Sequence, residues 1–236
     1  MTVFALVGLC ATAFAQEETG VEINGVTWAT RNVDAPGTFA ATPEDAGMYY
    51  RWNSKIGWNN SGEPSDGTSV WNAWDGGDAG FWESVNDPCP IGWRIPTLED
   101  FEKLIAADFE WVTEPAKGYR FYNGDNFIFI SAIAGVFQNG NLYDENFQSI
   151  YWCSDLKRSY YFYAGGFDYQ SGDDYNGFCV RCVKAEGDET AVTSVLSEAA
   201  AVVGYYSITG QRLPQVPEKG IYIIKYDNGK TEKRMK

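Results

Sequence analysis

The sequence predicts an α+β fold, in which one helix lies beside many short antiparallel strands. Three observations predict it. A single amphipathic helix pattern occurs, near residues 98–107. Most other apolar segments are short and alternate with polar residues, as strands do. Aromatic residues make up 16% of the chain and alternate with Gly, Asn and Asp instead of forming helical stripes, which is typical of a loop-rich domain.

The first element is a predicted secretory signal peptide at residues 1–15. Its apolar run ends in Ala-Phe-Ala at residues 13–15, a small-x-small cleavage site, and the polar Gln16 follows. A buried N-terminal helix or strand is one alternative, and a lipid anchor at Cys10 is another. No later segment is apolar for long enough to cross a membrane as a helix. We therefore expect an exported protein with no membrane span.

The elements of the main domain then follow in order. Residues 21–35 alternate around an Asn-Gly dipeptide at 24–25, which predicts a β-hairpin. Residues 47–85 are rich in Gly, Asn, Asp and Trp and predict a long loop region. The helix at 98–107 begins with a capping box formed by Thr97 and Asp100. Strands are then predicted at 119–122, 127–134, 149–153, 160–164 and 177–184.

The composition changes near residues 185–194. Residues 16–192 carry 11 basic and 28 acidic side chains, a net charge of −17, whereas residues 193–236 carry 7 basic and 4 acidic side chains, a net charge of +3. We predict a main domain over 16–185, a linker over 186–194 and a small β-rich module over 195–236. The last hairpin of this module turns at an Asn-Gly dipeptide at 228–229.

The charge and the missing residue types exclude several classes of function. The chain contains no histidine, which excludes Ser-His-Asp and Cys-His catalysis, histidine-ligated zinc and histidine pH switches. The formal net charge of −14 argues against nucleic acid as a partner, because phosphates require Lys and Arg.

Four cysteines remain after the predicted cleavage, and an even number in an exported chain predicts two disulfides. Cys179 and Cys182 lie three residues apart in a predicted strand, so their side chains point to opposite faces. A bond between them is therefore disfavoured, and two other pairings remain. Of these two pairings, we predict Cys89–Cys182 with Cys153–Cys179. A redox or zinc site at the Cys-x-x-Cys is the alternative use of these residues.

Five segments, taken in order, resemble the Fibrobacter succinogenes major paralogous domain, which is common in surface proteins of Bacteroidetes. They are INGVTWATRNVDAPG (23–37), MYYRWN (48–53), DPCPIGWRIPTLEDFEKL (87–104), YWCSD (151–155) and GFCVRCVK (177–184). The resemblance covers about residues 21–185 and implies a C-type-lectin-like fold. It also implies a bridge from the first helix region to the last strand, as the Cys89–Cys182 pairing requires. Cys153 and Cys179 stand where that family usually has small polar residues, and their joint presence supports a second bridge.

Residues 205–236 are similar to the C-terminal sorting-type tails of exported Bacteroidetes proteins. The matching parts are the ITGQR turn, the KGIYII strand and the basic end. This similarity implies that the protein is secreted or held on the outer cell surface of a bacterium. A plain C-terminal β-module is the alternative.

The sequence predicts neither a cofactor nor a catalytic residue. Calcium sites of lectins with this fold combine Glu-Pro-Asn or Gln-Pro-Asp with Trp-Asn-Asp, and the segments at 63–65, 71–73 and 114–116 supply only parts of these sets. The acidic, glycine-containing loops at 75–80 and 172–174 are the alternative places for calcium. We expect no metal and no enzymatic activity.

The remaining function is recognition. Two aromatic segments, 52–82 and 154–177, place Trp and Tyr beside Asn and Asp, a combination that suits glycans or protein surfaces. We predict a non-catalytic recognition domain that binds a glycan or a host or bacterial surface protein. The alternative is a structural subunit or tip component of a bacterial surface fibre. For any single tryptophan, the alternative is that it packs in the core or under a loop and binds no ligand. The candidate ligand-binding residues are Trp58, Trp71, Trp74, Asp75, Tyr160, Tyr161, Asp173, Asp174 and Tyr175.

Overall fold

The computed structural model describes residues 18–73, 80–172 and 175–185, and in the C-terminal part residues 202–207, 211–213, 215, 217, 221–226 and 231–235. The chain forms two compact units, Met1–Ala185 and Glu186–Lys236. The predicted signal peptide and the predicted linker lie outside the described residues. Within the described ranges, no helix has the length and apolar character needed to span a bilayer.

The first unit is mostly β, and this corrects the predicted α+β, C-type-lectin-like fold. Its described residues form five small sheets of two to four strands and a single α-helix. The physical reason is that the turn-rich segments between the predicted strands also pair, each over only two to six residues. Glycine and Asn at positive φ reverse the chain at short intervals, so that many short strands form and the described residues contain one short α-helix.

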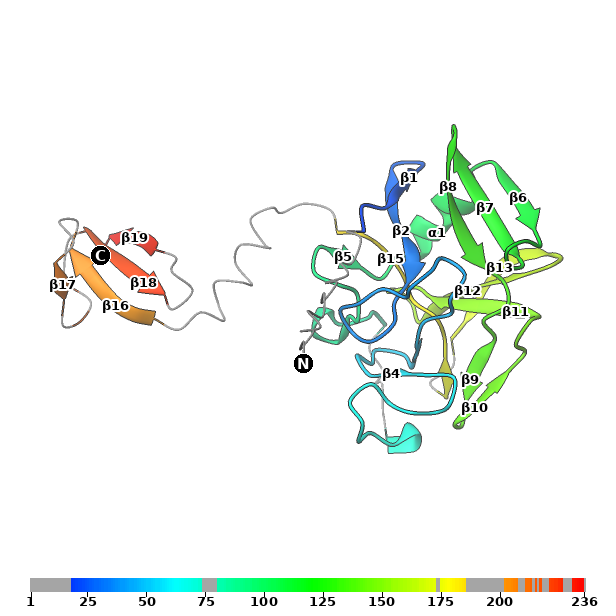
Figure 1. The fold of residues 1–236 in the computed structure, drawn as a ribbon, viewed down its shortest axis with the longest axis horizontal. Coiled ribbons are helices and arrows are strands. Elements are labelled where there is room, and N and C mark those ends of the chain that lie inside the picture. Colours follow the sequence, from blue (N-terminus) through cyan, green and yellow to red (C-terminus); the bar gives the residue numbers. More distant parts are fainter. Residues whose placement is uncertain are drawn as a thin grey trace, which may run out of the picture. The chain divides into compact units, whose positions relative to one another are not determined.

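A four-stranded antiparallel sheet joins the start of the unit to its end. Its strand order is β1 (Val21–Ile23), β2 (Val26–Asn32), β15 (Arg181–Lys184) and β5 (Trp93–Arg94), and Figure 1 shows yellow β15 beside blue β2. The predicted hairpin is confirmed, because β1 and β2 pair across Asn24 and Gly25, whose φ angles are 48° and 81°. Both angles are those that a two-residue type I′ turn needs.

Helix α1 (Leu98–Ile105) begins where the sequence predicts and ends two residues earlier. The capping box is confirmed: the Thr97 hydroxyl accepts from Asp100 N at 3.1 Å, and Thr97 N donates to Asp100 Oδ2 at 2.8 Å. A third cap comes from far along the chain, since Leu98 N donates to Asp155 Oδ1 at 2.8 Å. The apolar face of the helix buries Phe101 against Trp28, with ring centroids 5.0 Å apart.

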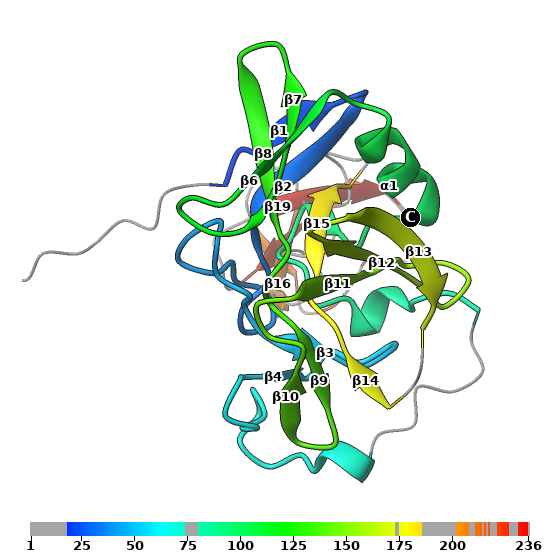
Figure 2. The same cartoon turned by 90° about the vertical axis from the view of Figure 1, so that its right-hand side faces the viewer.

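Three further sheets of three strands each complete most of the unit. They are β6 (Phe109–Val112), β7 (Gly118–Asn123) and β8 (Asn126–Ser131); β11 (Gln148–Trp152), β12 (Arg158–Tyr163) and β13 (Gly166–Ser171); and β10 (Asn141–Tyr143), β9 (Val136–Gln138) and β14 (Asn176–Gly177). In both views the β6–β8 sheet lies at one end of the unit and the β9–β10 hairpin at the other, with β11–β13 between them (Figures 1 and 2).

Four of the five strand predictions coincide with β7, β8, β11 and β12. The fifth, at 177–184, is wrong as a single strand, because Gly177 ends β14 and residues 181–184 form β15, in two different sheets. The long loop region contains the two-stranded sheet β3 (Tyr49–Tyr50) and β4 (Gly57–Trp58) and two 3₁₀ turns, η1 (Trp71–Ala73) and η2 (Ser84–Asn86).

The Cys89–Cys182 disulfide is confirmed, with the two Cα atoms 6.1 Å apart and a sequence separation of 93. Asp87 holds the loop that carries Cys89, because its carboxylate accepts from Cys89 N at 2.8 Å and from Ile95 N at 3.1 Å. The bridge therefore fixes the chain just before α1 to strand β15.

The predicted Cys153–Cys179 disulfide is wrong: both residues are buried thiols. Cys179 lies opposite Tyr151 in a parallel bridge, with Cys179 N donating to Ile150 O at 2.9 Å. Cys153 follows Tyr151 by two residues, so the two cysteines do not lie opposite each other on the neighbouring segments. Each packs in the apolar core as a small hydrophobic residue.

The second unit is a four-stranded antiparallel sheet. Its order is β17 (Arg212–Leu213), β16 (Val202–Ser207), β18 (Ile221–Tyr226) and β19 (Thr231–Met235). Strands β18 and β19 pair from Ile221 with Met235 to Lys225 with Thr231, the pairing that the predicted hairpin requires. The turn residues 227–230 lie outside the described residues.

Candidate functional site

Trp58 and Trp71, two of the predicted binding residues, lie together. Trp58 ends β4, which pairs with β3, and Trp71 opens the 3₁₀ turn η1. Their ring centroids are 5.2 Å apart in an edge-to-face arrangement, and each side chain is about nine-tenths buried, with 6% exposure. Trp74 and Asp75 lie outside the described residues.

Trp71 is held from three sides. Its ring packs against Phe137 with centroids 4.8 Å apart. The Arg51 guanidinium lies 5.4 Å from the ring centroid and donates to Trp71 O. A Cβ atom at Gly177 would come 2.7 Å from the Trp71 ring, so β14 runs directly beside this tryptophan. The structure therefore brings the end of the second aromatic segment to the Trp58–Trp71 pair.

Two side-chain turns shape the loop between Trp58 and Trp71. Asn59 Oδ1 accepts from the main-chain N–H groups of Ser61 and Glu63 at 3.0 and 2.9 Å. Asp66 Oδ1 accepts from the N–H groups of Thr68 and Ser69 at 3.1 and 3.0 Å. Asn and Asp favour such turns because their short side chains reach the backbone two or three residues ahead. The loop therefore presents residues 68–70 in a defined conformation.

The end of this loop, together with Trp58 and neighbouring residues, lines an open cavity of about 320 Å³, which we call the hydroxyl-lined pocket. Four of its lining residues are apolar and three carry hydroxyl groups, and among the described residues no charged side chain lines it: Ser54, Ile56, Trp58, Thr68, Ser69, Val70 and Ala73. Its volume falls at the lower end of the roughly 300–1,000 Å³ found for small-molecule sites. The chemistry offered is apolar contact combined with neutral hydrogen bonding.

The predicted tyrosines do not gather at this pocket. Tyr160 is buried and stacks on Phe101 of α1 with centroids 4.9 Å apart, and burial raises the pKa of its phenol to about 12. Tyr161, on the opposite face of β12, is half-buried and stacks on Tyr163 at 5.7 Å. Tyr175 is exposed. Asp173 and Asp174 lie outside the described residues.

A second cavity, of about 470 Å³, differs in charge. We call it the acidic cavity, because four carboxylate residues line it: Asp34, Glu44, Asp45 and Glu145. Its described lining residues include no Lys or Arg. Asn59 and Asn60 add two amides. Within the described ranges, no three Cys, Asp or Glu side chains are grouped closely enough to hold a metal ion. The carboxylates are therefore spread around the cavity and give it a negative potential.

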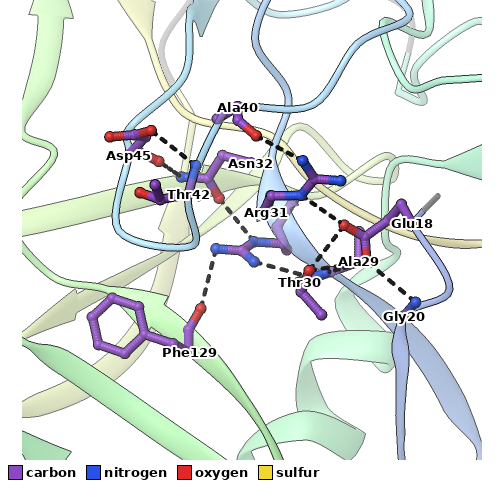
Figure 3. Close-up of polar contacts among 11 residues, drawn as sticks. Glu18, Gly20, Ala29, Thr30, Arg31, Asn32, Ala40, Thr42, Asp45 and Phe129 are labelled. Atoms are coloured by element: carbon purple, nitrogen blue, oxygen red, sulfur yellow. Dashed lines mark hydrogen bonds and ion pairs between the residues drawn. The ribbon is translucent and has the colours of Figure 1, made fainter. Parts of the chain in front are cut away.

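The wall of the acidic cavity formed by residues 40–46 is fixed by side chains of β2. Asn32 Nδ2 donates to Asp45 O at 3.0 Å and to Ala46 O at 3.1 Å, and Arg31 Nη1 donates to Ala40 O at 3.2 Å. Figure 3 shows Arg31 and Asn32 reaching from the strand to this loop. Strand β2 therefore holds the backbone of this wall in place.

Most residues that line the hydroxyl-lined pocket are not among the predicted binding residues. Ser54, Thr68 and Ser69 fall in the segment that the sequence predicts only as a long loop region. The local signal was Asp66-Gly67-Thr68-Ser69, a sequence typical of a side-chain turn. The proposed calcium loops at 75–80 and 172–174 fall largely outside the described residues.

The comparisons with known proteins add no relative. No protein-family model matches the chain, and no curated protein or solved structure shows significant similarity to it.

Proposed function

We propose that the first unit is a non-catalytic recognition domain of an exported protein, and that it binds a carbohydrate in the hydroxyl-lined pocket. The observation that carries this proposal is the lining of the pocket, where Trp58 lies beside three hydroxyl residues and no described side chain is charged. The Cys89–Cys182 disulfide and the two buried thiols also support it.

The lining matches the two kinds of surface that a sugar ring presents. Apolar C–H groups pack well on aromatic and aliphatic side chains, here Trp58, Ile56 and Val70. Sugar hydroxyls both donate and accept hydrogen bonds, as Ser and Thr hydroxyls do. A protein partner that inserts one side chain would use the same pocket. A flat protein epitope would cover the pocket without bonding to its Ser and Thr hydroxyls, and these unpaired groups would cost binding free energy.

The disulfide supports an exported location. Structural disulfides persist in oxidising compartments, and Cys89–Cys182 closes a long loop that begins before α1 and ends in β15. The predicted signal peptide, the resemblance to a surface-protein domain and the sorting-type tail point to the same location. We propose the outer cell surface of a bacterium, or the medium around it.

The remaining thiols support a role without catalysis. Burial raises the pKa of Cys153, and it raises the pKa of Cys179 to about 12. Neither thiol is therefore ionised at neutral pH, and a thiol that stays protonated is a poor nucleophile. Histidine is missing from the whole chain.

A glycan array probed with the purified full chain tests the proposal. The informative variant is Ala73→Trp, which places an indole in the hydroxyl-lined pocket from an exposed position. The matched control is Ala41→Trp, an equally large change at an exposed alanine that lines the acidic cavity. We expect glycan binding by the native chain, retention by Ala41→Trp, and a loss of at least about tenfold in Ala73→Trp with its melting temperature unchanged.

Two results would overturn the proposal. An array with no bound glycan removes the carbohydrate assignment, as does binding that Ala73→Trp leaves intact. If the array is empty and a surface protein is captured by the native chain but not by Ala73→Trp, the pocket belongs to a protein-recognition site instead.

A further inference from the structure

Asp66 is hydrogen-bonded to two residues that line the hydroxyl-lined pocket, Thr68 and Ser69. Its Oδ1 atom holds the turn through the main-chain N–H groups of Thr68 and Ser69, and its Oδ2 atom accepts from the Ser69 hydroxyl at 2.6 Å. Ser69 lines the pocket. The carboxylate is thus one hydrogen bond away from a group that a ligand would meet.

This bond fixes the polarity of the Ser69 hydroxyl. A serine hydroxyl has one proton to donate and two lone pairs that accept. Because a hydrogen bond to a carboxylate is about twice as strong as one between neutral groups, the proton of the Ser69 hydroxyl stays directed toward Asp66 Oδ2. Toward a ligand in the pocket, Ser69 Oγ is therefore an acceptor.

The carboxylate also keeps its charge. The hydrogen bonds from the Ser69 hydroxyl and from the main chain lower the pKa of Asp66 to about 2. Asp66 is exposed, so the negative charge is reached by solvent and its field is partly screened.

We infer that Asp66 determines which sugars the pocket accepts: it favours neutral or amine-bearing sugars, which donate to Ser69 Oγ, over sugars that carry a carboxylate or sulfate. This inference rests on the proposed function and deepens it. A ligand carboxylate at Ser69 would meet a lone pair instead of a proton, and it would lie close to a second negative charge. For two unit charges ~5 Å apart in water, the repulsion alone weakens binding about fourfold.

Sugars that differ only at C6 give a direct test. Methyl glucoside with methyl glucuronide, and methyl galactoside with methyl galacturonide, each exchange a CH₂OH group for a carboxylate. We expect the native chain to bind the neutral member of a recognised pair more tightly than the acidic member, by about fourfold or more. Isothermal titration at two salt concentrations separates the hydrogen-bond contribution from the screened charge contribution.

Asp66→Asn reverses the polarity while keeping the turn. Its Oδ1 atom still accepts from the two main-chain N–H groups, and its amide now donates to Ser69 Oγ, which releases the Ser69 proton toward the pocket. We expect the neutral-to-acidic preference to fall by about fourfold or more. Asp125→Asn is the matched control, because Asp125 is exposed at the turn between β7 and β8 and its substitution makes the same change in net charge.

The outcomes separate the two proposals. If neutral sugars bind but the native chain does not discriminate, or if Asp66→Asn keeps the full preference, the role of Asp66 is refuted while the carbohydrate site stands. If no sugar of any pair and no glycan of the array binds, the proposed function and this inference both fail. Ser69→Ala serves as a second variant: we expect weaker binding of the neutral sugars, and unchanged binding would also refute the inference.

Discussion

Arg181 Nε donates to Asn32 Oδ1 over 2.8 Å, and both side chains are completely buried. The other guanidinium nitrogens donate to Ala29 O and Phe129 O, each at 3.1 Å. Arg181 on β15 therefore ties together β2 and β8. Arg181 forms no ion pair with any of the described residues, so neutral oxygens satisfy this buried cation. Burial lowers the pKa of Arg181 from its ordinary value.

Arg181→Met is expected to lower the free energy of unfolding by about 3–5 kcal/mol, because it leaves three buried acceptors without donors. Urea denaturation followed by tryptophan fluorescence measures this loss. Lys55→Met is the control, since Lys55 is exposed and such substitutions change stability by about 0.5 kcal/mol or less. Equal stability of Arg181→Met and the native chain would contradict the proposed role of the buried guanidinium.

Removal of the Cys89–Cys182 disulfide is expected to destabilise the first unit by about 2–5 kcal/mol, since the bridge restricts a long loop in the unfolded chain. The double variant Cys89→Ser/Cys182→Ser, compared with the native chain in urea, gives this value. Reducing agent should destabilise the native chain and leave the double variant unaffected. A double variant as stable as the native chain would show that the bridge contributes little.

Cys153 and Cys179 are expected to resist alkylation in the folded protein and to react once it is unfolded. Burial raises the pKa of both thiols, to about 12 for Cys179, and the thiolate is the reactive form. Iodoacetamide treatment at pH 8 with and without denaturant, followed by peptide mass mapping, reads each residue separately. Detection of a peptide linked through Cys153 and Cys179 would instead restore the second disulfide that the sequence predicts.

Glu18 is expected to make stability fall at acid pH. Burial alone would raise the pKa of this carboxyl, but the hydrogen bonds from Thr30 and Arg31 outweigh burial and lower the pKa below 4.5. Figure 3 shows Glu18 with these partners, including the Arg31 Nε contact at 3.0 Å. A carboxyl whose pKa is lowered in the folded state stabilises above its unfolded pKa, and this contribution disappears as the pH falls through the folded pKa.

The variant Glu18→Gln isolates this contribution. At pH 7 we expect it to be less stable than the native chain by roughly 1–3 kcal/mol, the range for hydrogen bonds to charged groups. The difference should shrink steadily below about pH 4.5, the unfolded pKa of Glu. Melting temperatures between pH 7 and pH 3 measure it, with Glu22→Gln as an exposed control on β1. A difference that is constant over this range would contradict the assignment.

Features encoded within a few residues were predictable from the sequence. The Asn24-Gly25 hairpin and the capping box of Thr97 and Asp100 depend on local hydrogen bonds and backbone angles, which neighbouring side chains decide. The prediction that Cys179 and Cys182 point to opposite sides also holds. Their side chains enter different core clusters, although no single strand contains both residues. The candidate site was predictable only in part: Trp58 lines a pocket, whereas Tyr160 packs in the core.

By itself, the sequence determined the turn at Asn24-Gly25, the start of the helix, and the opposite facing of Cys179 and Cys182, which excludes a bond between them. Only the tertiary structure decided the small-sheet β architecture, the separation of Cys153 from Cys179 and the burial of Trp58, Trp71 and Tyr160. The reason is that these features depend on the offset between segments far apart in the chain. A strand pattern shows which face a side chain takes, but the packing of distant segments decides what covers that face.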